Sequence, residues 1–133
     1  MGDKQLHSQE ALIENRAVFL SDFITLTYAT HTQVLVASLP KGAVILGYCI
    51  EIVTAFDDST SNHIDIGTVS LPHDYVNDFD GDGAAGIYRG NINKRMAADT
   101  NVYCDYTPIG TGHTAGEARI GLIWSPWAAG VGV

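Results

Sequence analysis

The chain has 133 residues, of which 46% are hydrophobic, with two cysteines and a formal net charge of −8 at pH 7. A chain of this length fits one domain whose core needs no disulfides, and its acidic balance argues against nucleic acid as a partner because it repels phosphate backbones. No stretch approaches the roughly 20 apolar residues of a membrane span, and the polar start lacks the apolar core of a signal peptide. We therefore expect a soluble protein made in a cytoplasm, with no membrane partner.

Residues 1–16 are polar, and we interpret them as an N-terminal arm that precedes a single β-sandwich domain over residues 17–133. Within the arm, the run Glu10-Ala11-Leu12-Ile13-Glu14 fits either one helical turn or an extended strand. An isolated helix this short is marginal in water unless it packs against something. Both conformations stay open from the sequence.

From residue 17 onward, the apolar and polar residues alternate as they do in half-buried strands. The pattern predicts strands over residues 17–28 and 33–39, and then a long apolar strand over 43–56 that forms a hairpin with a partner over 63–69. The long strand is apolar on both faces, so its second face is expected to be covered by another element or another subunit. Ile64 and Ile66 are expected to face the core, with His63 and Asp65 exposed.

The pattern predicts a long irregular region over residues 70–98, with one short strand over 87–92. Two late strands follow over 101–107 and 117–124. The sum is an all-β fold: an antiparallel two-sheet sandwich of about seven or eight strands, without helices of βαβ length. The aliphatic residues expected to meet between the sheets are Leu46, Ile50, Ile52, Ile64, Ile66, Ile120 and Leu122.

An acidic loop carries the sharpest local motif, because Asp78, Asp80 and Asp82 alternate as in the first half of a calcium-binding loop. The twelfth position, where a glutamate should close the coordination sphere, is Arg89. We therefore interpret this loop as a surface turn of acidic residues, with a bound cation as the alternative. No cofactor is expected.

The chain shows no arrangement typical of catalysis. The five histidines are scattered, no Gly-x-Ser-x-Gly turn is present, and the two cysteines fall inside predicted strands, where thiols behave as small hydrophobes. We predict that the protein is not an enzyme. Near the end of the sequence, Pro126 stops the last strand and leaves Trp127 outside it, where a large apolar ring needs a cover from this domain or from a neighbour.

Three segments resemble a known family: the run from Leu39 to Gly47 with the later Ala55-Phe56, the run Ile64-Asp65-Ile66-Gly67-Thr68 with Tyr75 beyond it, and the closing run from Thr114 to Ile120. They are similar to the small jelly-roll-like structural proteins of tailed bacteriophages, especially head decoration or cement proteins. The resemblance covers roughly residues 36–125.

The resemblance implies a non-enzymatic, jelly-roll-like β-domain, often a homotrimer, on the outer surface of a virion capsid, where its partner is the major capsid protein. An arm that orders on binding would suit such cementing. The alternative is a receptor- or carbohydrate-binding domain associated with a phage tail or fibre, which would use the 70–98 region for recognition. Expected capsid or subunit contacts are Lys4, Leu6, Leu12, Ile13, Arg16 and Trp127.

Overall fold

The computed structural model describes residues 18–126, and within this range it contains nine β-strands and no helix. The alternation of β-branched and polar residues predicted strands, and the structure forms strands from these residues. Their bounds are β1 Phe19–Leu20, β2 Ile24–Thr27, β3 Val34–Leu39, β4 Val44–Thr54, β5 Ser61–Gly67, β6 Val76–Asp80, β7 Gly86–Arg95, β8 Thr100–Ile109 and β9 Glu117–Ser125.

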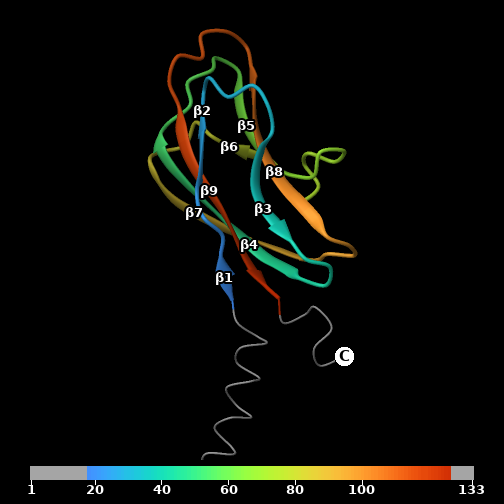
Figure 1. Cartoon of the computed structure of the whole chain (residues 1–133). Helices are drawn as coiled ribbons and strands as arrows, with labels where there is room; N and C mark the ends of the chain where they lie inside the picture. The colour runs from blue at the N-terminus through green and yellow to red at the C-terminus, as the bar shows by residue number, and fades with distance from the viewer. Residues whose placement is uncertain (1–17, 127–133) are drawn as a thin grey trace, which may run out of the picture.

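The strands form two antiparallel sheets that face one another (Figure 1). Sheet A has the order β1-β9-β4-β7 with β2 also paired to β9, and sheet B has the order β3-β8-β5-β6. Strands pair from the outside of the sequence inward, as β2 with β9, β3 with β8, β4 with β7 and β5 with β6. These pairs alternate between the sheets, which is the topology of a jelly roll. The predicted all-β, jelly-roll-like sandwich is confirmed, with one or two more strands than expected.

The predicted hairpin between residues 43–56 and 63–69 is wrong, although both strands exist. β4 lies in sheet A between β9 and β7, whereas β5 lies in sheet B between β8 and β6. The polar connection after β4 therefore carries the chain from one sheet to the other. Neighbouring apolar strands suggest a hairpin, but in a rolled fold consecutive strands do not pair unless they close the roll, as β5 and β6 do here.

The core lies between the sheets, and six of the seven residues expected there are buried. Leu46 is the exception, since it is only partly buried while Ile45 is fully buried in its place. The pairing of β4 with both of its neighbours shifts between Ile45 and Gly47, and a bulge of this kind exchanges the two faces of a strand. The core also takes in Phe56, Val102 and Tyr106.

The region over residues 70–98 is more regular than predicted, because it contains β6 and the ten-residue β7. Both are edge strands, and their side chains are mostly exposed. Asp78 and Asn93 have positive φ angles of 59° and 56°, which interrupt the regular strand conformation. Because these edge strands are exposed, polar and irregular, they show little of the hydrophobic alternation from which strands are predicted.

Candidate functional site

The carboxylates of the acidic loop interact with other groups of the same domain. Asp78 Oδ1 lies 3.1 Å from Nδ1 of His63, and the Asp78 backbone N–H donates to Oδ1 of Asp65 at 2.6 Å. The Asp82 backbone N–H donates to Oδ1 of Asp80 at 3.1 Å, and the side-chain hydrogen bond and the negative charge of Asp80 raise the pKa of Asp82. Within residues 18–126 no group of three or more His, Cys, Asp or Glu side chains is arranged to hold a metal ion.

Sheet B carries a pair of facing carboxyl groups on its outer side. Asp65 lies directly opposite Asp105 in the pairing of β5 with β8, and burial followed by the charge of Asp65 raises the pKa of Asp105. Oδ1 of Asp105 is buried and has no hydrogen-bond partner within the described part of the chain. The predicted exposure of Asp65 is wrong, because this residue is only 8% exposed beneath the Asp78 backbone.

A hydrogen-bonded cluster closes the upper end of the sandwich, where the β4–β5 connection meets the β8–β9 loop (Figure 1). Asn62 is 1% exposed, and its Oδ1 accepts hydrogen bonds from the Asp58 backbone N–H and the Tyr106 hydroxyl, both at 2.8 Å. Its Nδ2 donates to the Asp58 carbonyl at 3.2 Å. The Asp58 side chain is fully buried and lies 3.1 Å from Nδ1 of His113.

Asp57 fixes the β8–β9 loop from outside this cluster. Its carboxylate accepts from the Thr114 backbone N–H at 2.8 Å, the Thr114 hydroxyl at 2.7 Å and the Ala115 backbone N–H at 3.0 Å. The hydroxyl bond first, and then the backbone bonds, lower the pKa of Asp57. The loop also brings the His113 ring to 6.2 Å from that of His31, a proximity that the sequence did not predict. The cluster contains no activated nucleophile. We therefore interpret its hydrogen bonds as structural contacts that anchor this end of the sandwich.

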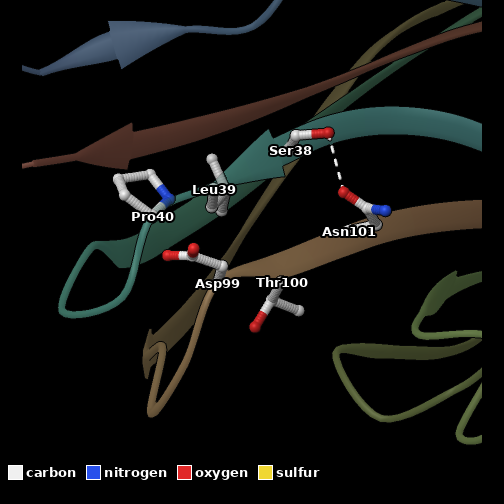
Figure 2. Close-up of a pocket in the computed structure, with 6 residues that line it drawn as sticks. All are labelled: Ser38, Leu39, Pro40, Asp99, Thr100 and Asn101. Carbon is white, nitrogen blue, oxygen red and sulfur yellow. Dashed lines mark hydrogen bonds between the residues drawn. The ribbon is translucent and has the colours of Figure 1, made fainter.

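A polar hollow of about 440 Å³ lies at the opposite end, between the turns that follow β3 and precede β8 (Figure 2). The hydroxyl of Ser38 donates to Oδ1 of Asn101 at 2.7 Å, and the Lys41 backbone N–H donates to Asp99 at 2.9 Å. These contacts join the two turns. The hollow is broad and open, and its polar groups already bond to one another, so it offers little to a small ligand.

The outer side of sheet A has a different character, because two adjoining apolar hollows of about 360 and 220 Å³ share Arg89 and Ile123. We call this surface the outer hollow. Its further lining residues are Val18, Phe19, Leu20, Leu46, Gly47, Cys49, Gly90 and Asn91.

Charge is divided between the two sheets. Among residues 18–126 there are five Lys and Arg residues, and four of them lie on sheet A: Arg89, Lys94, Arg95 and Arg119. The strands of sheet B carry four aspartates and no Lys or Arg. The outer hollow is thus both apolar and positively flanked, whereas sheet B presents an acidic surface. The predicted cover for the second face of residues 43–56 is present in part, because Val18, Phe19 and Leu20 line the same hollow as Cys49 of β4.

Several predicted residues lie outside the described range, namely Lys4, Leu6, Leu12, Ile13, Arg16 and Trp127. Their contacts stay predictions. β9 ends at Ser125, directly before Pro126, as predicted. Cys49 and Cys104 are both free and buried, with Cys49 lining the outer hollow and Cys104 in the core.

Comparison with known proteins places the fold among virus capsid chains. No protein-family model and no curated protein matches the chain. A solved chain of the cyanophage Pam1 capsid asymmetric unit is similar over 83% of this chain and 85% of its own length, with a TM-score of 0.59 and 18% identity. A chain of the acidic stable capsid of Helicobacter pylori bacteriophage KHP30 is similar over 82% of this chain and 88% of its own, with a TM-score of 0.62 and 12% identity. At these identities the similarity establishes a shared fold.

The outer hollow is the feature that sequence reasoning missed. Its lining comes from β1, β4, β7 and β9, which are far apart in the sequence and meet only through the rolled topology. One signal was present, since a strand that is apolar on both faces predicts a covered second face. The position of that cover could not be predicted without knowing that β4 pairs with β9 and β7.

Within residues 18–126 no helix is long and apolar enough to cross a membrane.

Proposed function

We propose that this chain is a structural protein of a bacteriophage virion, a decoration or cement protein that binds the outer capsid surface and stabilises the shell. One observation carries the proposal: the jelly-roll topology, with more than four-fifths of the chain aligned, is shared with chains of two phage capsid structures. The proposed partner is the major capsid protein, and the proposed assembly is a homotrimer on the capsid surface.

The surface chemistry supports a role in assembly over one in catalysis. The outer hollow is an open sheet face that does not place a nucleophile beside a base among the described residues, and the polar clusters bond internally. The acidic balance suits an outer surface better than an inner one that faces packaged DNA. We propose that the protein has no enzymatic activity and does not bind nucleic acid.

The arm at residues 1–16 and Trp127 are the proposed contacts to the capsid or to a neighbouring subunit, through Lys4, Leu6, Leu12, Ile13 and Arg16. A polar segment that becomes ordered on binding loses conformational entropy, but it can cover a large surface and join two subunits. Such a contact resists the separation of adjacent capsid subunits.

The test is binding to DNA-free shells assembled from the major capsid protein encoded with this chain. The full chain is expected to co-sediment with shells at a stoichiometry of hundreds of copies per particle. A chain that lacks residues 1–16 is expected to remain folded by circular dichroism and to lose shell binding. Retained binding would contradict the role of the arm, and a few copies confined to the tail would contradict decoration.

A further inference from the structure

The outer hollow combines an apolar floor with a guanidinium that has no partner among residues 18–126. Arg89 lines both of its halves and makes no hydrogen bond or ion pair with any residue between 18 and 126, whereas Arg119 on the same face lies 3.5 Å from Glu51. Ile123 and Leu20 lie beside Arg89 in the hollow. A cation set in apolar surroundings favours a ligand that offers a carboxylate next to apolar side chains.

The chain itself contains a segment with this chemistry. Glu10 and Glu14 flank the apolar residues Leu12 and Ile13 in the arm. A short segment of this kind can place aliphatic side chains on the floor of the outer hollow and a carboxylate on Arg89. The outer surface of sheet B is a poor competitor, because its strands carry four aspartates and no Lys or Arg.

The position of β1 indicates which copy of the segment reaches the hollow. Phe19 lies opposite Trp124 and Leu20 opposite Ile123, so the chain enters β1 from the end of the sandwich at which β9 stops (Figure 1). The chain before Val18 therefore joins the body at the rim of the hollow, on the side away from Cys49 and Arg89. The same copy could fill its own hollow only by reversing direction within the few residues between Glu14 and Val18.

Docking onto a second copy needs no such reversal. An extended segment spans roughly 3.3–3.6 Å per residue, so the four to eight residues that separate residues 10–14 from Val18 span roughly 13–29 Å. This reach is sufficient only where the hollow of the second copy lies next to β1 of the first, so the proposal requires that the two copies are direct neighbours.

We propose that residues 10–14 of one copy dock in the outer hollow of a second copy, with Leu12 and Ile13 on its apolar floor and a glutamate on Arg89. The interaction joins neighbouring copies through exchanged arms. It deepens the proposed role of the arm but requires no capsid protein. The two ideas can therefore fail separately, because arm exchange is measured on the protein alone.

The test is disulfide cross-linking in the full-length chain. A variant that carries Ile13→Cys and Cys49→Ser is mixed with a tagged, otherwise unchanged chain that keeps Cys49, and the mixture is oxidised. Cys49 is 6% exposed and lines the hollow, whereas Cys104 lies in the core, is 1% exposed, and has a thiol whose pKa is raised to about 12 by burial, so Cys104 is not expected to compete. A cross-linked heterodimer is expected on a non-reducing gel, with the Ile13-to-Cys49 linkage identified by mass spectrometry.

Two charge variants of the tagged chain supply a matched pair. Arg89→Glu is expected to slow cross-linking roughly tenfold. Lys41→Glu makes the same charge change on the β3–β4 turn, outside the lining of the hollow, and is expected to leave the rate within about twofold of the unchanged chain. Circular dichroism of each variant shows that the domain is still folded.

Four outcomes would overturn the proposal. A chain with Ile13→Cys and native Cys49 that forms only an internal disulfide would show that each arm occupies its own hollow. No linkage to Cys49, or an equal yield when the acceptor cysteine is moved to sheet B by Thr107→Cys with Cys49→Ser, would show that the hollow is not the docking site. Equal slowing by Arg89→Glu and Lys41→Glu would show that only net charge matters.

Discussion

Substitution of Asn62 tests whether the buried hydrogen-bond cluster anchors the upper end of the sandwich. In Asn62→Ala, the Asp58 backbone N–H, the Asp58 carbonyl and the Tyr106 hydroxyl lose their partner in the interior. An unsatisfied buried polar group costs about 1–3 kcal/mol, so we expect a loss of about 3–5 kcal/mol in the free energy of unfolding after local rearrangement. This is a large share of the about 5–15 kcal/mol that stabilises a typical domain.

Tyr106→Phe is the matched control, because Oδ1 of Asn62 keeps its bond from the Asp58 backbone N–H. Burial raises the pKa of Tyr106 to about 12, so the hydroxyl is a proton donor at neutral pH, and its removal is expected to cost about 1–1.5 kcal/mol. In urea, with a slope near about 2 kcal/mol per M, the midpoint is expected to fall by about 1.5–2.5 M for Asn62→Ala. A midpoint for Asn62→Ala no lower than that for Tyr106→Phe would refute the anchoring role.

Three further predictions follow from single residues. Gly116 has φ of 145°, and a Cβ there would lie 2.3 Å from the Phe56 ring, so Gly116→Ala is expected to cost about 2–4 kcal/mol in urea unfolding, while Gly112→Ala, with open space around it, should cost less. The hydrogen bonds to Asp57 lower its pKa, so its contribution is present above the ordinary value of 3.8 and lost as pH falls through the lowered value; thermal unfolding of Asp57→Asn should change less between about pH 5 and pH 2 than that of the unchanged chain. The pKa of Asp105 is raised by burial and by Asp65, so its protonated form favours folding below 3.8 and this contribution is lost as pH rises through the raised value; Asp105→Asn should melt higher than the unchanged chain at pH 7 and equal it near about pH 3, and a constant difference would contradict this.

The sequence was sufficient for the fold class because the core strands follow a regular period. Ile120 and Leu122 alternate with outward residues along β9, and Val102, Cys104 and Tyr106 do so along β8; all five are buried. Such alternation depends only on the local geometry of a strand, so it can be read without knowing its partners.

Pairing and register depend on distant parts of the chain, and there the predictions failed. The connection after Thr54 looks like a hairpin turn, yet it crosses between the sheets. The exchange of Ile45 for Leu46 in the core follows from a bulge that no residue pattern marks. Asp65 looks like an exposed alternating residue, but a hydrogen bond from the Asp78 backbone covers it. Each error concerns what a strand contacts across the roll.

The rolled topology also explains why the most distinctive surface of the protein lies on sheet A. In the roll, β9 is the closing strand, so it lies between β4 and the first strands of the domain. The outer side of β9 and β4 is therefore bordered by β1 on one side and by the basic edge strand β7 on the other. Because β1 has only two residues, it leaves part of this apolar surface uncovered, and the uncovered part is where Arg89 lies without a partner among the described residues. The same connectivity that buries the core thus places an apolar, positively flanked hollow at the point where the preceding segment of the chain joins the domain.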